Sequence, residues 1–300
     1  MARKITKFIE ILKLPEVRDI KNLDDPAVTL LHARIIQNKP FLKKLYIDFY
    51  KQFLQAIPDP QKKFLVELGS GGGFIKEVIN NVITSDVLNL PNVDKVFSAL
   101  NMPFENSSVD AFFMIDVLHH ITNPRAFFKE ALRCLKIGGK IVMIEPANTF
   151  WSRFIYKNFH HELFDTQANW EIVADTKRPV SQGNGAIPWI IFCRDRQIFE
   201  KDFQALKIVR IRNHTPLCYL LSGGLTLRQL IPSFTYPVIK AIEYLLSPLR
   251  NLLGMFQTIE LQKKELTAEN AKNAEKKLKL KNSATSALSA VKLVEHPVAV

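Results

Sequence analysis

A glycine-rich turn between residues 64 and 74, FLVELGSGGGF, constrains the fold of this 300-residue chain more than any other stretch. The apolar run 64–68 stops at Gly69, and a short apolar run bounded by glycine is typical of a buried parallel strand. From Phe74 onward, apolar residues recur at i, i+4 and i+8, which predicts a helix. A strand, a glycine turn and a helix start bring bare backbone amides against a ligand, because glycine has no Cβ and helix starts have unpaired N–H groups.

Two details narrow the class of ligand. Glu67 lies inside the predicted strand, and position 74, where the dinucleotide pattern needs a third small residue, is phenylalanine. The pattern E-x-G-x-G-x-G resembles the first motif of class I S-adenosylmethionine (SAM) methyltransferases, in which the turn holds the methionine end of SAM. The resemblance assigns Glu67, Gly69, Ser70 and Gly71 to the cofactor site. The alternative is a tight strand–helix turn that binds no ligand.

A second acidic residue, Asp86, ends the apolar run 82–86. It follows Gly69 at about the spacing of ~20 residues expected for an acid that hydrogen-bonds ribose hydroxyls. A carboxylate suits this role because it accepts hydrogen bonds from both hydroxyls. The alternative is that Asp86 only caps the next turn. In the same family an aspartate usually contacts the adenine amino group; here that position is Ser98, so the resemblance leaves Ser98 and the backbone at Ala99 as adenine contacts, with packing alone as the alternative.

The order of motifs between residues 98 and 146 carries the most specific resemblance. It resembles the type 11 group of small-molecule SAM methyltransferases, which includes enzymes of ubiquinone and menaquinone synthesis. The shared elements, in chain order, are Pro103-Phe104, an apolar strand ending at Ile115, Asp116, the LHH run 118–120, a helix capped by Asn123, Gly138-Gly139, and a strand ending in Glu145-Pro146.

Three of these residues, Asp116, His119 and His120, follow the fourth predicted strand. Ligands of parallel sheets bind beyond the carboxyl ends of the strands, so we expect all three to face the acceptor and Asp116 to contact SAM as well. A histidine of near-neutral pKa can take a proton from a hydroxyl acceptor, but such a pair can also merely order its loop. His161, four residues before Asp165, is a further catalytic candidate. His160 and His161 are adjacent, and adjacent histidines point in different directions on a helix, so we expect no metal at that pair.

The resemblance implies an α/β fold: a Rossmann-like, doubly wound sheet, mostly parallel, with an antiparallel last strand. Residues 1–62 are expected to form an N-terminal helical cap. The methyltransferase domain spans 63–264, with a lid over 148–197 and a mainly helical apolar insert over 215–254. Residues 265–300, rich in Lys, Ala, Asn, Glu and Ser, are expected to form a mobile tail.

The formal net charge of +12 favours acidic partners or an anionic membrane surface, although a soluble enzyme from a basic proteome carries the same charge. The chain lacks an N-P-P-Y element and a basic–aromatic stripe, so we expect no nucleic acid and a small-molecule or lipid-linked acceptor. Three widely spaced cysteines indicate a reducing compartment. No uncharged apolar run reaches the ~18 residues of a membrane span. We therefore expect a cytoplasmic protein.

The apolar insert qualifies that expectation. Val238, Ile239, Ile242, Leu245, Leu246 and Leu249 recur at helical spacing, with Lys240, Glu243 and Arg250 on the other side. Such a segment can lie on the inner face of a membrane, attracted by anionic lipid, or it can enclose an apolar acceptor. The alternative is that the apolar stripe packs on the domain and completes its core.

The sequence as a whole predicts a SAM-dependent methyltransferase that works by in-line displacement. The cofactor carries the reactive group, so the protein mainly supplies positioning and water exclusion. Two alternatives remain open. One is a SAM-binding, membrane-associated assembly factor without turnover. The other is a nicotinamide-dependent oxidoreductase, against which the glycine spacing argues.

Overall fold

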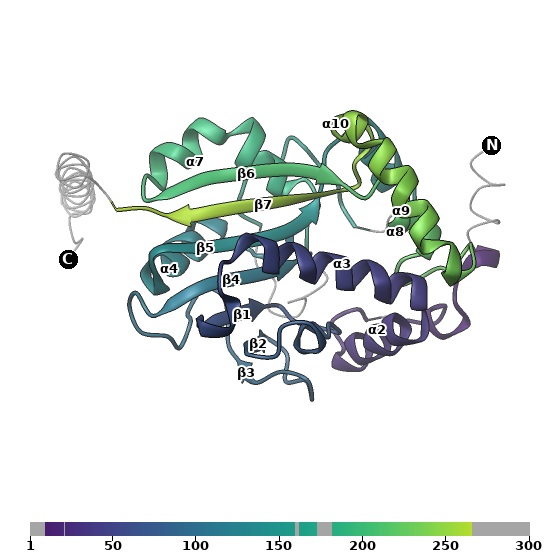
Figure 1. Cartoon of the computed structure of the whole chain (residues 1–300), viewed down its shortest axis with the longest axis horizontal. Coiled ribbons are helices and arrows are strands. Elements are labelled where there is room, and N and C mark those ends of the chain that lie inside the picture. The colour runs from purple at the N-terminus through teal and green to yellow at the C-terminus, as the bar shows by residue number, and fades with distance from the viewer. Residues whose placement is uncertain (1–9, 21, 160–161, 173–181, 266–300) are drawn as a thin grey trace, which may run out of the picture. The chain divides into compact units, whose positions relative to one another are not determined.

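The computed structural model describes residues 10–20, 22–159, 162–172 and 182–265. In this part of the chain seven strands form one sheet, in the order β3-β2-β1-β4-β5-β7-β6 (Figure 1). The strands are β1 (Leu65–Leu68), β2 (Val82–Asp86), β3 (Lys95–Val96), β4 (Val109–Ile115), β5 (Leu135–Pro146), β6 (Leu206–His214) and β7 (Phe256–Lys263).

The pairing of the strands confirms the predicted fold class. Strands β1 to β5 pair in parallel, and β7 lies antiparallel between β5 and β6. The strand order reverses at β1, which has β2 on one side and β4 on the other. Loops leave such a reversal point in opposite directions, and the crevice between them is where ligands of doubly wound sheets bind.

Helices cover both faces of the sheet. Figure 1 shows α3 across the near face and α4 and α7 behind the strands. The α-helices are α2 (Pro26–Asn38), α3 (Pro40–Ala56), α4 (Pro124–Cys134), α5 (Phe150–Phe159), α6 (Ile187–Trp189), α7 (Arg196–Asp202), α8 (Cys218–Ser222), α9 (Tyr236–Leu245) and α10 (Arg250–Leu253). Short 3₁₀ turns are η1 (Pro15–Val17), η2 (Pro60–Lys62), η3 (Ile75–Glu77), η4 (Leu118–His120), η6 (Ser233–Thr235) and η7 (Ser247–Leu249), and η5 (Ile190–Arg194) is a π-helix.

Local capping chemistry sets two helix starts where the sequence predicts them. The side chain of Asp25 accepts a hydrogen bond from Ala27 N, and Pro26 begins α2. The side chain of Asn123 accepts one from Ala126 N at the start of α4. In both helices the capping oxygen pairs an amide that would otherwise lack an intrahelical partner.

The prediction of a helix after the glycine turn is wrong. Only the 3₁₀ turn η3 forms there, and the chain enters β2 at Val82. Ile75 and Ile79 are both buried in the core. The apolar spacing of this stretch therefore comes from core packing and from the entry into β2, and not from one face of a helix. The amides that face the ligand therefore belong to the glycine turn itself, without a helix start behind it.

Aromatic side chains fill the core on both faces of the sheet. Phe53 of α3 stacks on Phe113 of β4, with ring centroids 4.7 Å apart. On the other face Phe128 of α4 packs edge-to-face on Phe199 and Phe203. All five rings are nearly or fully inaccessible to solvent, and aromatic side chains of this size dominate the free energy of core burial.

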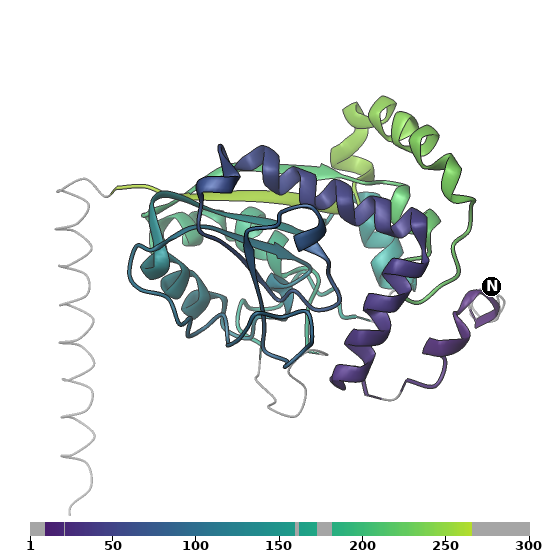
Figure 2. The same ribbon diagram turned by 60° about the horizontal axis from the view of Figure 1, so that its bottom comes forward.

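The insert packs against the N-terminal helices beyond the carboxyl ends of the parallel strands (Figures 1 and 2). Lys39, buried at the end of α2, donates hydrogen bonds to Gly224 O at 2.5 Å and Leu227 O at 2.8 Å. Tyr236 Oη donates to Asp48 Oδ2 at 2.6 Å. Cap, sheet and insert thus belong to one compact unit that ends at Lys263.

Within the described ranges, no helix combines the length and the apolar character that crossing a membrane requires. The predicted tail falls almost wholly on residues 266–300, and the start of the predicted N-terminal helical cap falls on residues 1–9. Both lie outside the described residues.

Candidate functional site

A cavity of about 920 Å³ opens at the carboxyl ends of the parallel strands. Tyr46 and Tyr50 of α3 and His32 of α2 form part of its wall, so the N-terminal helices border it. His161 lies outside the described residues. The lining brings together the other candidate residues of the sequence analysis, namely Glu67, Gly69, Ser70, Gly71, Asp86, Ser98, Ala99, Asp116, His119 and His120.

The glycine turn is packed too tightly for side chains. Gly69 has φ +65° and Gly71 φ +48°, a left-handed region that favours glycine. A Cβ on Gly72 would lie only 2.7 Å from Ala33 N, because α2 passes directly over the turn. Tyr50 Oη of α3 accepts a hydrogen bond from Phe74 N at 3.1 Å. The turn is therefore shaped by the N-terminal helices as well as by its own sequence.

Asp86, at the end of β2, holds the turn from the other side. Its Oδ2 accepts from Gly71 N at 2.8 Å, and its Oδ1 accepts from Leu88 N at 2.9 Å. A carboxylate has about four acceptor positions, so two remain for a ligand hydroxyl. This arrangement places an acid at the edge of the cavity where the sequence predicts the ribose contact.

Glu67 is buried in β1 beneath the turn, with 3% of its surface exposed. Its Oε2 has no hydrogen-bond partner among the described residues. Burial raises its pKa to about 8, against a hydrogen bond from Ser70 that lowers it, and the charge of Asp86 adds to the rise. An orphaned buried carboxyl group on a cavity wall favours a cationic partner. The ammonium and sulfonium groups of SAM meet that requirement, so these residues fit SAM.

Ser98 and Ala99 line the same cavity beside Phe97 and Leu88. Ser98 Oγ accepts a hydrogen bond from Leu100 N at 3.2 Å, which stabilises its own turn. A serine hydroxyl keeps its proton to donate, so an adenine contact through Ser98 would be a donated bond to a ring nitrogen. The sheet order places this loop on the β2 side of β1, next to Asp86.

Asp116 directly follows β4 and has φ +55°. Its N–H donates to Ile144 O at 2.9 Å, which ties the left-handed turn to the neighbouring strand β5. Burial raises the pKa of the Asp116 carboxyl group to about 8; His119 opposes the rise, while Glu145 and Glu162 add to it. Backbone strain at a cavity-lining acid is a feature of functional sites.

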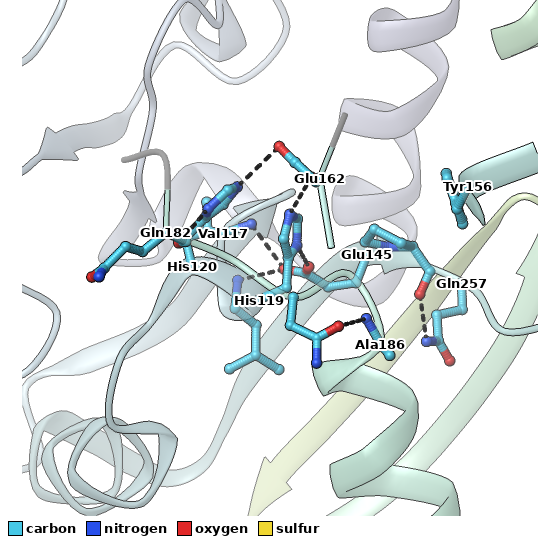
Figure 3. Close-up of polar contacts among 12 residues, drawn as sticks. Val117, His119, His120, Glu145, Tyr156, Glu162, Gln182, Ala186 and Gln257 are labelled. Carbon is cyan, nitrogen blue, oxygen red and sulfur yellow. Dashed lines mark hydrogen bonds and ion pairs between the residues drawn. The ribbon is translucent and has the colours of Figure 1, made fainter. Parts of the chain in front are cut away.

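Figure 3 shows a buried carboxylate–histidine pair, Glu145 and His119. Their ligand atoms lie within 4.8 Å of a carboxylate oxygen of Asp116. His119 Nδ1 is 2.7 Å from Glu145 Oε2, and the side chains are 2% and 0% exposed. The second oxygen of Glu145 accepts from Val117 N at 2.9 Å and Leu118 N at 2.7 Å. Burial alone would lower the pKa of His119, but the charges of Glu145 and Glu162 outweigh it and raise the pKa well above 6.5. The ring is therefore held in a fixed orientation by the end of β5.

The neighbouring ring of His120 differs in charge. Its Nδ1 lies 3.0 Å from Gln182 O, an acceptor that requires the proton on Nδ1. Burial, followed by the charge of His119, lowers the pKa of His120 to about 4. At neutral pH its Nε2 therefore carries a lone pair, and this atom faces Glu162 at 3.8 Å (Figure 3).

The sequence analysis missed the roles of three residues. The sequence places Glu145 at the end of a predicted strand and suggests no role for it. An acid at the carboxyl end of a parallel strand nevertheless indicates a residue at the ligand-binding edge of the sheet. Glu162 comes from the predicted lid, and only the folded chain brings it to the histidines. Asn184 is buried, its N–H donates to His119 O at 3.0 Å, and its side chain bonds both backbone groups of Asp165.

Residues 66–143 match the family model described as a methyltransferase domain. No curated protein sequence matches the chain. Similar solved structures include phosphoethanolamine N-methyltransferase 2 of Haemonchus contortus in complex with SAM, which is 15% identical, has a TM-score of 0.47, and aligns over 82% of this chain and 59% of its own.

Two further similar structures are SAM-dependent methyltransferases. The one from Mesorhizobium loti is 13% identical, with a TM-score of 0.41 and coverage of 71% of this chain and 96% of its own. The one from Methanosarcina mazei is also 13% identical, with a TM-score of 0.42 and coverage of 71% and 98%. The narrower resemblance to ubiquinone and menaquinone enzymes stays a prediction. Residues 66–143 thus match a methyltransferase domain, and the sheet topology and the glycine turn with its strand-end acids suit a SAM-binding domain of that kind.

Proposed function

We propose that the chain methylates a largely apolar small molecule or lipid-linked compound, bound beside SAM in the same cavity. The observation that carries this proposal is the composition of the cavity wall beyond the glycine turn. A wall that is mainly apolar with a few convergent polar groups suits an apolar acceptor with a polar reacting atom. The apolar side chains in question are Ile155, Tyr156, Leu163, Phe164, Tyr219, Leu220, Leu225 and Phe256.

The mechanism we propose is in-line displacement at the methyl group of SAM. SAM supplies the activated methyl group, and the protein aligns the acceptor atom behind it and excludes water. Asp116 follows β4, the neighbour of β1, so its carboxyl group is proposed to face both SAM and the acceptor. A base among Asp116, His119 and His120 is required only where the acceptor must lose a proton.

Water exclusion is proposed to come from the segment 148–197, the predicted lid. Its described parts contribute Phe159, Leu163 and Gln182 to the cavity lining. Asn184 anchors this segment to the loop of His119 through the hydrogen bonds given above. A lid held at that point can cover the acceptor without disturbing the glycine turn.

Mass spectrometry of cell extracts incubated with the protein and methyl-labelled SAM tests the acceptor class. We expect label in an organic-phase compound, with Asp86→Ala as the inactive control because it removes the ribose contact. Label found only in aqueous-phase polar metabolites would contradict the proposal for the acceptor. No label in either phase, despite SAM binding, would contradict turnover itself.

We further propose that α9 and α10 bring the enzyme to the anionic inner face of a membrane. The polarity of α9 supports this, because it is inverted relative to a helix that packs on a core. Glu243 is buried and accepts hydrogen bonds from Leu217 N and Cys218 N, while Lys240 pairs with it at 3.1 Å. The charged residues of α9 thus face the protein.

Most apolar residues of the same segment face solvent, although Tyr236 is buried and Ile239 packs against the core. Phe234 is 80% exposed, Tyr244 78% and Leu245 75%. Val238, Ile242, Leu249 and Leu252 are exposed as well and continue at helical spacing. An exposed apolar stripe of this kind, on a chain of net charge +12, suits the interface of an anionic bilayer. Of the stripe, Ile239 packs against the core and Leu246 is half-buried, so the exposed face consists of Val238, Ile242, Leu245 and Leu249.

Flotation with vesicles of neutral and anionic phospholipid tests the membrane proposal. We expect the wild-type protein to float with anionic vesicles and the double variant Phe234→Ser, Leu245→Ser to stay in the soluble fraction. The control Val96→Ser, Ile137→Ser removes two exposed apolar side chains elsewhere and should float as wild type does. If the two double variants float equally, α9 and α10 are not the membrane surface.

A further inference from the structure

Three side chains with metal-binding atoms converge on the cavity wall beside the acceptor region. They are His119, His120 and Glu162, and their ligand atoms all lie within 4.8 Å of one another. Glu162 Oε2 is 3.5 Å from His119 Nε2, and Glu162 Oε1 is 3.8 Å from His120 Nε2. Figure 3 shows both rings directed at the same carboxylate.

The opposite nitrogen of each ring is held by an acceptor. His119 Nδ1 bonds to Glu145 Oε2 at 2.7 Å, and His120 Nδ1 bonds to Gln182 O at 3.0 Å. A carboxylate or carbonyl on Nδ1 fixes the tautomer, leaves Nε2 as the ligand atom and makes that atom more basic. Histidines that bind metals in proteins are oriented by acceptors of this kind.

The rings are also held in place by packing. Their centroids are 4.1 Å apart, and a Cβ on Gly183 would lie 2.6 Å from His120 Nδ1. Glu145 itself is fixed by the N–H groups of Val117 and Leu118. The two Nε2 atoms therefore have little freedom to move apart. Side chains that are held in place before binding are suited to bind a ligand, because they need no further ordering.

We propose that His119, His120 and Glu162 bind a divalent transition-metal ion of the zinc type. Two imidazoles and a carboxylate form a donor set suited to such ions. In a tetrahedral site with bonds of about 2.0–2.1 Å, ligand atoms lie roughly 3.3 Å apart, so ligand atoms that now lie within 4.8 Å of one another must approach by up to about 1.5 Å. This proposal departs from the expectation of a chain without metal, which rested on the pair His160 and His161.

Among the described residues these three ligands line the cavity wall, so an ion held by them would have a coordination site open toward the cavity. Three protein ligands with an open position are typical of catalytic rather than structural zinc sites. Resting on the proposed function, the open position would bind an oxygen atom of the acceptor and direct it toward SAM. Metal binding itself does not depend on that role.

Titration of the metal-free protein with Co²⁺, followed by its visible absorption, and with Zn²⁺ by calorimetry tests the proposal. We expect one ion per chain for the wild type. Glu162→Gln and His120→Ala should each weaken binding by at least ~10-fold, since even loss of an orienting residue has an effect of that size. The control His32→Gln changes a cavity-lining histidine outside this cluster and should bind as wild type does.

Two measurements keep the outcome clear. Circular dichroism and SAM calorimetry on each variant show whether the fold and the cofactor site persist, so a failed metal site is distinguishable from a failed methyltransferase. Equal metal affinity in the wild type and Glu162→Gln, or absence of any bound ion, would overturn the proposal. Gln in place of Glu162 keeps the side-chain size, so loss of affinity there reports the carboxylate ligand.

Discussion

His119 Nδ1 lies 2.7 Å from Glu145 Oε2, and this buried contact joins the loop after β4 to the end of β5. The same carboxylate accepts the N–H groups of Val117 and Leu118. One side chain at a strand end therefore determines the course of the loop that carries Asp116, His119 and His120.

We expect Glu145→Ala to destabilise the fold strongly. The change leaves two buried N–H groups and one buried histidine nitrogen without their acceptor, at a cost of about 3 kcal/mol in the free energy of unfolding. The control Glu200→Ala breaks an exposed i,i+4 pair with Arg196 and should cost less than about 0.5 kcal/mol. Urea denaturation measures both, and equal losses would show that the buried network is unimportant.

We expect Asp86→Asn to weaken SAM binding by about 10- to 100-fold, because an amide replaces the charged group that we propose as the acceptor of the ribose hydroxyls. The control is Asp94→Asn, in the loop before β3. Asp94 accepts from Thr84 N and does not line the cavity, so its change should alter stability and leave SAM affinity close to wild type. Calorimetric titration that finds the same affinity for both variants would place the ribose elsewhere.

The substitution Gly72→Ala tests the contact between the glycine turn and α2. A Cβ there meets Ala33 N at 2.7 Å, so α2 must shift, at a cost of about 1–3 kcal/mol and at least ~10-fold in SAM affinity. Gly138→Ala is the control: its φ is +81°, but nothing lies within 4 Å of the added Cβ. That variant should lose about 1 kcal/mol from backbone strain and bind SAM normally.

The pH dependence of stability reports the burial of Glu67. Its pKa is raised to about 8 in the folded chain, above the ordinary carboxyl value of about 4.3 in the unfolded chain. The folded state therefore binds the proton more tightly, and this stabilising contribution is full below about pH 4 and is lost as the pH rises toward 8. Relative to Glu67→Gln, the wild type should lose stability between pH 5 and 8 and then level off. Parallel denaturation profiles at pH 5, 7 and 9 for the two proteins would contradict the burial of this carboxyl group.

Much of the fold and of the cofactor site could be predicted because its signals are local. The strand before Gly69, the acid at the end of the next strand, and the helix starts at Asp25 and Asn123 depend on residues within a few positions of each other. The antiparallel last strand was predicted through resemblance, and the pairing of β7 with β5 confirms it.

The features that the sequence did not predict depend on contacts between distant segments. Glu145 and His119 meet only because β5 pairs with β4, and Glu162 reaches the histidines only from the segment after α5. The absent helix after the glycine turn and the inverted polarity of α9 share one cause. Apolar spacing shows which residues avoid water in a regular helix, and it does not show which neighbouring segment covers them.

Calorimetric titration of the purified protein with SAM, and separately with NADH, tests the central claim most directly. The orphaned carboxyl group of Glu67, the acid at Asp86 and the glycine turn predict one molecule of SAM bound per chain, no measurable heat with NADH, and strong loss of SAM binding in Asp86→Asn. Binding of NADH instead of SAM, or SAM affinity that Asp86→Asn leaves unchanged, would contradict the assignment of this cavity to SAM.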